Sequence, residues 1–192
     1  MADTTMIERA AAAREKVNTE IVPALLEAFA GKSEQIPAGN DLIPQVYVDV
    51  NESLAVAKWL RDHGFNMLVD LTAADYYPNR TPRFEVVYHF RQLPALGMIR
   101  VRVKCTEKDQ VASLSDLWPM AIAAECEVWD LMGIHFKGHP DLHRVMNPED
   151  WEGHPLRRDY PIRGPRGLIN LEMPADENRY HPFVDEEPKE GK

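Results

Sequence analysis

Cysteine is scarce in this sequence: Cys105 and Cys126 are the only two among 192 residues. Two thiols cannot build a disulfide framework, and they fall short of the roughly four thiolates that an iron–sulfur cluster or a thiolate zinc site requires. The composition therefore indicates a reducing compartment and predicts a chain without a redox centre of its own. Because Cys126 falls on an apolar helical stripe, we interpret it as a small core residue and not as a nucleophile.

Several motifs that identify enzymes are missing. There is no Gly-x-Gly-x-x-Gly or Gly-Lys-Ser/Thr to bind nucleotide phosphates, and no Gly-x-Ser-x-Gly of a serine hydrolase. No apolar run approaches the roughly 20 residues of a membrane helix, and the first residues lack the basic and apolar regions of a signal peptide. We therefore expect no nucleotide chemistry in this chain, and contact with a membrane only through partners.

Basic residues are fewer than acidic residues. The chain has 22 basic and 31 acidic residues, which gives a formal net charge of −9 at pH 7. Nucleic-acid binders need a basic surface that neutralises phosphates, so we expect no nucleic-acid partner. An acidic surface would suit a basic protein partner, although acidic chains are common.

Hydrophobic periodicity predicts alternating helices and strands over the first 132 residues. Residues 5–29 are expected to form a helix that Pro23 breaks in two, and residues 31–44 to form a connector. Asn51 is expected to cap the next helix, which ends at the left-handed residue Gly64. A last helix opens at residues 115–119. The predicted strands are 45–50, 65–74 in the centre of a sheet, 83–93 with one buried face, and 98–104.

These elements predict an α+β fold, in which a mixed, largely antiparallel sheet is covered by helices on one face. The last helix is expected to bury a stripe that includes Ile122 and Trp129. Eight of the fifteen prolines lie from Pro140 onward, where regular patterning ends. We therefore divide the chain into an N-terminal helical segment (1–38), an α+β core domain (39–138) and an extended irregular C-terminal arm (139–192) that docks on partner subunits.

The region from Glu125 to Pro161 is the most informative. It begins as a helix, turns at Gly133 and continues as an irregular segment with many charged and aromatic residues. Long ordered loops usually contact a ligand or another protein. The basic pair at residues 157–158 and the nearby Trp151 favour a packed contact with another protein, because aromatic and arginine side chains concentrate at interface centres.

The acidic residues of this region are interpreted as structural. Glu125 and Glu127 point about 200° apart on a helix and form no carboxylate pair, whereas Glu127 and Asp130 share a face. Buried acids need partners, so we expect them to bind arginines and to fix the arm on the domain. A catalytic general base is the alternative. The candidate arginines are Arg144, Arg157 and Arg158.

His139 and His154 each precede a proline, which holds the histidine backbone extended. With Asp141, Asp150 and Glu152 nearby, they could be metal ligands of a free-standing metal-dependent hydrolase. The spacing matches no metal motif, however. We expect each histidine to be neutral and to donate to a backbone carbonyl inside a packed segment.

Three blocks of residues, at 125–136, 138–142 and 153–161, follow one another in this region. In their order and spacing they resemble the signature of the C subunit of NADH-quinone oxidoreductase, respiratory complex I. The resemblance is strong over residues 117–164. Over residues 40–116 it is limited to the arrangement of the predicted elements. Members of that family usually have arginine where this chain has Cys126 and His143. The matching residues are Glu125, Glu127, Asp130 and Gly133; His139, Pro140, Asp141 and Arg144; and Gly153, His154, Pro155, Leu156, Arg157, Arg158, Asp159, Tyr160 and Pro161.

This resemblance implies a cofactor-free structural subunit in the peripheral arm of a proton-pumping complex. The complex would pass electrons from NADH through FMN and iron–sulfur clusters to quinone, while this chain holds the quinone-site (D) subunit and the iron–sulfur subunits together. It implies a peripheral location on the cytoplasmic side of the inner (plasma) membrane. The equivalent subunit of a membrane-bound hydrogenase or of a ferredoxin–plastoquinone complex, and a generic adaptor domain, are alternatives.

Overall fold

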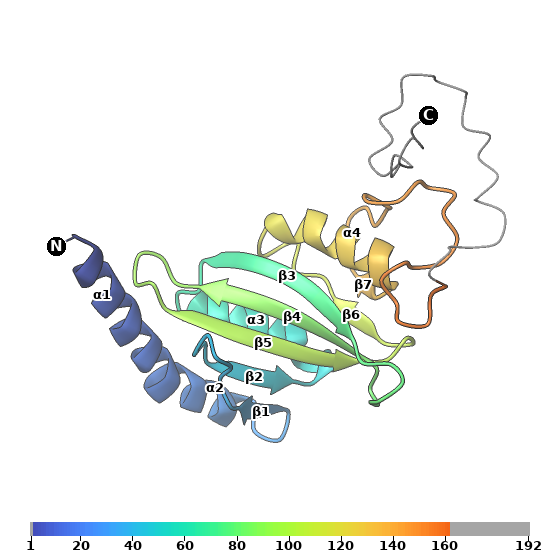
Figure 1. Ribbon diagram of the computed structural model, residues 1–192. Coiled ribbons are helices and arrows are strands. Elements are labelled where there is room, and N and C mark those ends of the chain that lie inside the picture. Colours follow the sequence, from blue (N-terminus) through green and yellow to red (C-terminus); the bar gives the residue numbers. More distant parts are fainter. Residues whose placement is uncertain (1, 162–192) are drawn as a thin grey trace, which may run out of the picture.

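The computed structural model describes residues 2–161 and is built around a five-stranded sheet in the order β1-β2-β5-β4-β3 (Figure 1). Strand β2 runs parallel to β5, and every other pair of neighbours is antiparallel. The predicted mixed, largely antiparallel α+β fold is thereby confirmed. The strands are β1 Ser33–Ile36, β2 Gln45–Val48, β3 Met67–Asp75, β4 Phe84–Arg91 and β5 Met98–Cys105, and a small parallel pair is formed by β6 Gln110–Ala112 and β7 His135–Lys137.

Helix α3 lies behind the sheet, and helix α4 packs along strand β3, whereas α1 and α2 lie at the β1–β2 side (Figure 1). None of the described helices is long and apolar enough to cross a membrane. The helices are α1 Ala2–Lys16, α2 Val22–Ala28, α3 Ser53–Asp62 and α4 Met120–Met132, with a π-helical turn at Val17–Ile21 and a 3-10 turn at Val50–Glu52.

The core lies between the helices and the inner face of the sheet. Apolar side chains alternate along β4 and β5, so that one set from each strand points inward. Helices α2 and α3 add Leu25 and Leu60, both fully buried. Val17 also joins this core, so part of the predicted N-terminal segment packs with the α+β core domain. Residues 162–192 of the predicted arm lie outside the described residues.

Two predictions about strand positions are wrong. Strand β3 was expected in the centre of the sheet but lies at its edge. Helix α4 packs along it, and Leu68 and Leu71 are its buried apolar side chains. Strand β4 was expected to bury one face, yet all five residues from Phe84 to Tyr88 are buried. Its outer face carries Glu85, which Arg80 and Arg102 cover and neutralise.

Predictions about element ends also need correction. The connector at residues 31–44 contains strand β1, whose polar sequence gave no alternation signal. Asp49 caps the 3-10 turn Val50–Glu52 that precedes helix α3, because its carboxylate accepts from the Asn51 backbone N–H. The N-cap of α3 itself is Glu52, which makes no side-chain capping bond, so the prediction that Asn51 caps this helix is wrong. The N-terminal helix changes geometry one turn before Pro23, which itself lies at the start of α2. Gly64 is left-handed as predicted.

Helix α4 begins at Pro119 and ends at Gly133, as expected. Its buried stripe differs from the predicted one, because Ile122 is 39% exposed and Trp129 is only partly buried. The fully buried positions include two acids, Glu125 and Asp130, which a purely apolar interpretation of the stripe does not anticipate.

Candidate functional site

Residues 139–161, here called the strap, contain no helix or strand and pack against the C-terminal end of α4 (Figure 1). Gly133 ends the helix with φ 74°, and Gly138 turns the chain again with φ 86° after strand β7. A side chain at Gly133 would place its Cβ 2.5 Å from Arg157 and His154, so glycine is needed there for space as well as for conformation. The predicted turn at Gly133 is therefore also the place where the strap touches the helix.

The strap binds the backbone carbonyl groups at the end of α4. The last four carbonyls of a helix have no partner within the helix. Here the Gly133 N–H binds the Trp129 carbonyl at 2.8 Å, and the Leu156 N–H binds the Leu131 carbonyl at 2.9 Å. The Arg157 Nε donates to the Met132 carbonyl at 2.7 Å. His154 Nδ1 lies 2.9 Å from the remaining carbonyl, that of residue 130. The strap therefore completes the hydrogen bonding of the helix end.

The Asp130 carboxylate is fully buried beneath the strap and is surrounded by donors. Arg144 Nη1 lies 2.5 Å from it, and the backbone N–H groups of Val145, Met146 and Asn147 donate over 3.1, 2.8 and 2.9 Å. The Asn147 side chain adds a fifth bond. Burial by itself would raise the pKa of Asp130, but the bonds from Asn147 and the other donors hold it well below its usual range. This acid is a charged anchor for the strap.

Arg144 extends this anchor in two directions. Its Nη2 donates to the carbonyls of Trp151 and Gly153 at 2.7 and 3.0 Å, and its guanidinium lies 5.6 Å from the centre of the Trp129 ring. The predicted link between an acid of the helix and an arginine of the arm is thus confirmed for Asp130 and Arg144. One guanidinium therefore connects the helix with residues 151 and 153 of the strap.

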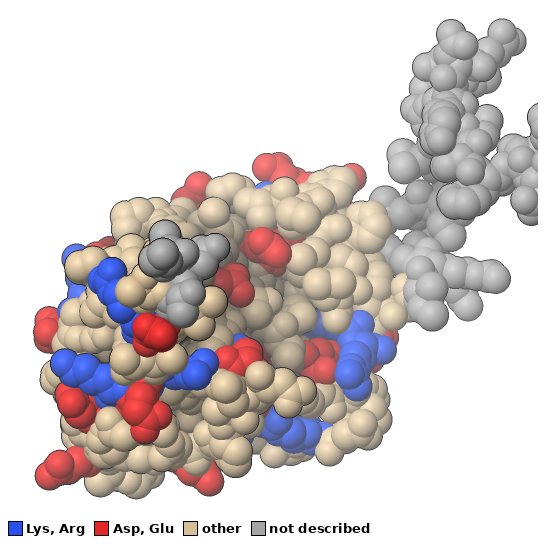
Figure 2. Space-filling view, turned by 60° about the vertical axis from the view of Figure 1, so that its left-hand side comes forward, with Lys and Arg blue, Asp and Glu red and all other residues tan. Residues whose placement is uncertain are grey.

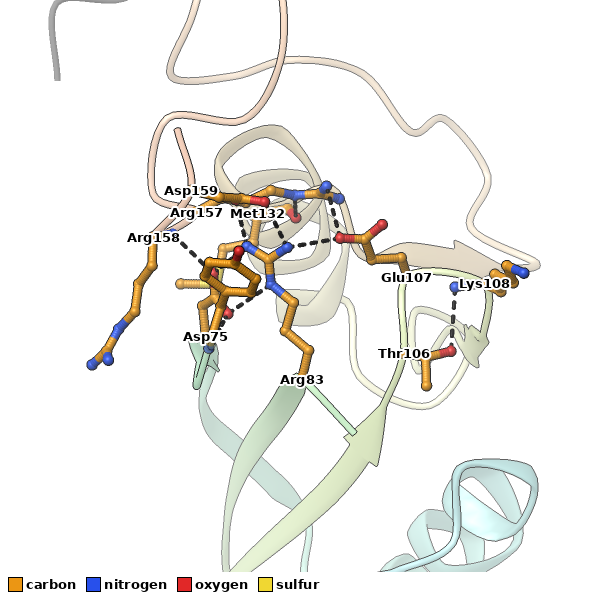
Figure 3. Close-up of polar contacts among 10 residues, drawn as sticks. Asp75, Arg83, Thr106, Glu107, Lys108, Met132, Arg157, Arg158 and Asp159 are labelled. Carbon is orange, nitrogen blue, oxygen red and sulfur yellow. Dashed lines mark hydrogen bonds and ion pairs between the residues drawn. The ribbon is translucent and has the colours of Figure 1, made fainter. Parts of the chain in front are cut away.

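A second junction fixes the far end of the strap to the sheet (Figure 3). Arg83 donates to both oxygens of Asp75, at 2.8 and 2.6 Å, and to both oxygens of Asp159, at 2.5 and 2.9 Å. The Arg158 backbone N–H also binds Asp75, at 2.9 Å. Burial opposes ionisation of Asp75, yet its bonds to Arg83 and to two backbone N–H groups lower its pKa to about 2. Arg83 lowers the pKa of Asp159 as well.

The two adjacent arginines of the strap have different environments. Arg157 points into the domain, where it lies 5.4 Å from the Phe84 ring and 3.5 Å from Glu107 (Figure 3). The side chain of Arg158 points away from this cluster and is exposed (Figure 3). Within residues 2–161 it has no hydrogen bond or ion pair. Of the two expected interface arginines, only Arg158 is free to contact another molecule.

Within residues 2–161, the two other predicted acids form no bond with an arginine. Glu125 is fully buried and accepts from the Ser113 hydroxyl at 2.6 Å and the Leu114 N–H at 2.7 Å. Burial raises its pKa, and these two bonds only partly offset that effect. Glu127 is exposed and lies beside the edge strand β3. The expectation of an arginine partner is wrong for Glu125, because its carboxylate binds Ser113 and Leu114 of loop 113–115 and not an arginine of the strap.

The two histidines bind carbonyl groups of α4, as predicted. His139 Nε2 lies 3.0 Å from the Ile122 carbonyl, and His154 binds that of Asp130. Those carbonyls are eight residues apart, about 12 Å along a helix, so the structure does not bring the two rings together. Burial lowers the pKa of His154, which favours the neutral ring. Among residues 2–161, no group of three or more His, Cys, Asp or Glu side chains is arranged to hold a metal ion.

The remaining predicted residues shape the strap. Cys126 is buried as expected and lies 3.8 Å from His139 Nε2. The exposed Asp141 carboxylate lies 3.3 Å from His143. Gly153 has φ 81°, and the Tyr160 ring packs where its Cβ would be. The partly or fully exposed side of the strap carries Pro140, Pro155, Leu156 and Pro161.

Sequence reasoning missed the residues of the sheet that hold the strap. Asp75 and Arg83 lie at the ends of β3 and β4, eight residues apart, and Asp159 lies 76 residues after Arg83. The acidic end of one strand and the basic start of the next gave a weak signal, since strand ends are commonly charged. Asn147 carried no signal either, because its role depends on where Asp130 lies.

Comparisons with known proteins agree with this geometry. A family model described as the 30 Kd subunit of respiratory-chain NADH dehydrogenase matches residues 46–166. The C subunit of an NADH-quinone oxidoreductase from Geotalea uraniireducens is 38% identical over 150 residues, which cover 77% of this chain and 90% of that protein. The protein of the same name from Roseiflexus sp. is 44% identical over 143 residues, covering 72% and 79%.

Two solved structures have a similar fold. A trypsin-resistant fragment (1–134) of Nqo5 is 34% identical, with a TM-score of 0.56, and the match covers 64% of this chain and 98% of the fragment. A chain in the membrane-bound sulfane sulfur reductase, an archaeal respiratory membrane complex, has a TM-score of 0.64 over 76% of this chain and 86% of that one. At 21% identity, this second likeness concerns the fold alone. The family match begins at the second residue of β2 and contains strands β3 to β7 and the whole strap, and the chain belongs to the family of the 30 Kd subunit of respiratory-chain NADH dehydrogenase.

Proposed function

We propose that this chain is a structural subunit of the peripheral arm of a proton-pumping NADH-quinone oxidoreductase, and that it binds no cofactor itself. The side chains that could perform chemistry are engaged in internal contacts. Asp130 receives five hydrogen bonds, Glu125 receives two, and His154 binds a helix carbonyl. Groups held in this way stabilise a surface and are not free to act on a substrate.

The observation that carries the proposal is the double attachment of the strap. One junction, at Asp130, fixes its first half to helix α4, and the other, at Arg83, fixes its second half to the sheet. Large side chains nevertheless point outward from this rigid segment: Met146 is 64% exposed, Leu156 54% and Val145 46%. Apolar side chains and an exposed guanidinium on one firmly attached segment are typical of the centre of a protein interface.

The neighbours in this proposal are the quinone-site (D) subunit and the iron–sulfur subunits. Relatives that are named as C subunits of NADH-quinone oxidoreductase support an assembly that contains NADH, FMN, iron–sulfur clusters and quinone in its other chains. The chain then lies on the cytoplasmic side of the inner membrane. The fold shared with a chain of the sulfane sulfur reductase complex supports the related alternative, an equivalent subunit in a complex with another electron donor.

The two adjacent arginines of the strap, Arg157 and Arg158, provide the test. Arg158→Ala removes an exposed guanidinium, so it should leave the unfolding temperature of the isolated chain unchanged and reduce its retention in the complex on native gels. Removing one partner of a desolvated charge pair costs about 2–5 kcal/mol at an interface. Arg157→Ala is the matched variant, and it should lower the stability of the isolated chain, because Arg157 binds the end of α4.

Assembly and quinone-reductase activity should be measured on membranes solubilised in mild detergent. Wild-type assembly and activity with Arg158→Ala would contradict the interface role of the strap. Identification of the co-purifying chains by mass spectrometry distinguishes NADH-quinone oxidoreductase from a complex with a different electron donor.

A further inference from the structure

A groove lies between helix α1 and the tip of the β4–β5 hairpin, at the opposite end of the sheet from the strap (Figure 1). It has a volume of about 190 Å³. Figure 2 turns this end of the molecule forward and shows basic side chains gathered there among acidic ones. The lining includes Ala10 and Arg14 of α1, Ile43 and Pro44 before β2, and Arg91 and Met98 of the hairpin.

Two guanidinium groups in this groove have no partner. Neither Arg14 nor Arg91 forms a hydrogen bond or ion pair with any residue in 2–161, and the Nε of Arg91 is buried. The groove does contain one acid, Asp41, but its carboxylate binds Arg100 at 2.5 Å and the Ile43 N–H at 3.2 Å. In a chain with 31 acidic and 22 basic residues, two uncompensated cations in one groove call for an external anion.

The walls of the groove are apolar and partly strained. Leu96 has φ 66° and lines the groove, and Leu42 has φ 58° and lines the adjoining hollow, which Arg14 also borders. Bulky residues avoid this left-handed region, and such strain is concentrated at binding sites. One turn before Ala10 on the same helix face, Met6 is 58% exposed. The surface therefore offers two cations and a neighbouring apolar wall.

We infer that this groove binds a segment of a neighbouring subunit in which an Asp or Glu is followed or preceded by a large apolar residue. The carboxylate would lie between Arg14 and Arg91, since guanidinium groups pair with carboxylates through two parallel bonds. The apolar side chain would cover Ile43 and Met98. An anionic membrane surface fits less well, because a chain of net charge −9 is repelled by it and two arginines are too few to compensate.

This inference rests on the proposed membership of a complex, and the experiment separates the two. A photo-crosslinking residue replaces Met98 in the full chain, the complex is purified from native membranes, and the cross-linked peptide is sequenced by mass spectrometry. The expected product is a peptide of another subunit with an acid next to an apolar residue. If the wild-type chain does not co-purify with other subunits, the proposed function fails. If the chain does co-purify but the cross-linked product is a lipid, a second copy of this chain or another part of the same chain, only the groove assignment fails.

Charge reversal gives an independent measure. Arg14→Glu and Arg91→Glu together should reduce the fraction of chain retained in the complex about tenfold or more, since like charges then face each other. If the double variant folds poorly, Arg14→Glu alone, at a helix surface position, should also reduce the fraction of chain retained in the complex. Arg9→Glu makes the same charge change on α1 outside the groove and should retain the chain within about twofold. Changing the cross-linked partner acid to lysine should restore retention of Arg14→Glu. Equal losses for Arg9 and Arg14 variants, or no rescue, would overturn the assignment.

Discussion

The middle and the end of helix α4 each bury a carboxyl group completely, yet the pKa values of the two groups are shifted in opposite directions. Glu125, in the middle, receives two hydrogen bonds, and its pKa is raised. Asp130, in the last turn, receives five, and its pKa is lowered. Since both residues have no exposed surface, the number and charge of the donors decide which form is favoured.

The difference predicts opposite contributions to stability. For Asp130 the unfolded state binds the proton more tightly, so its contribution is present above pH 3.8 and is lost as the pH falls through its lower folded value. For Glu125 the folded state binds the proton more tightly, so stability falls as the pH rises from 4.5 through its raised value and is constant above it. One acid holds the strap as an anion, and the other tolerates burial best as a neutral group.

The largest effect is expected from Asp130→Ala. The change removes the acceptor of five hydrogen bonds, one of them from the largely buried Arg144 guanidinium, and breaking such a pair costs about 3–5 kcal/mol. Urea unfolding of the isolated chain measures this loss. Proteolysis between residues 139 and 161 should accelerate as well. Glu127→Ala, three residues earlier on the same helix, removes an exposed acid and is the control; a similar loss there would mean that helix charge, and not the buried bonds, holds the strap.

A smaller effect is expected from Arg83→Lys, which tests a third buried acid. Asp75 and Asp159 both form two-bond contacts with the planar guanidinium, and lysine keeps the charge without this geometry. We expect a loss of about 1.5–3 kcal/mol, measured by thermal unfolding at neutral pH.

The pH dependence sharpens the Arg83 experiment. Burial opposes ionisation of Asp75, but its bonds to Arg83 and to two backbone N–H groups lower its pKa to about 2. Because Arg83 is one of these donors, the difference between wild type and variant should shrink as the pH falls from 3.8 to about 2. Arg158→Lys, at an exposed position of the same strap, should change stability by less than about 0.5 kcal/mol. A difference that is independent of pH would assign the effect to packing alone.

The smallest effect is expected from Glu125→Gln. The neutral amide keeps an acceptor for the Leu114 N–H and removes a carboxylate that burial disfavours, so stability at neutral pH should change by less than about 1 kcal/mol. The wild type should gain stability relative to the variant as the solution is acidified through the raised pKa of Glu125. Stability curves from pH 4 to pH 8 report this. A large loss at neutral pH would show that the carboxylate is a required anion and would remove the contrast with Asp130.

Much of the fold could be predicted from local pattern. The alternation of Ile99, Val101 and Val103 against basic residues is found in β5, and Gly64 and Gly133 end their helices as expected. The errors occur where a distant element changes the environment of a residue. Strand β3 has an apolar sequence but lies at the sheet edge, where helix α4 packs along it, and the polar strand β1 is held in the sheet by its pairing with β2.

The candidate site was predictable in part. The irregular course of residues 139–161, the link between Asp130 and Arg144 and the histidine–carbonyl contacts follow from residue types that need partners when buried. The roles of Asp75 and Arg83 did not follow, because their partner Asp159 lies 76 residues from Arg83. The different environments of Arg157 and Arg158 were not predictable either, since identical neighbours in sequence point in opposite directions.

The sequence by itself determined the class of fold, the turns at glycine and the family, because hydrophobic period, backbone conformation and motif spacing are local properties. Only the tertiary structure decided which acid is held as an anion and, within residues 2–161, which arginine side chains of the strap and of the groove beside α1 have no partner. Those properties depend on donors and acceptors that the folded chain brings together from distant positions, and charge and hydrogen bonding act over a few ångströms regardless of separation in sequence.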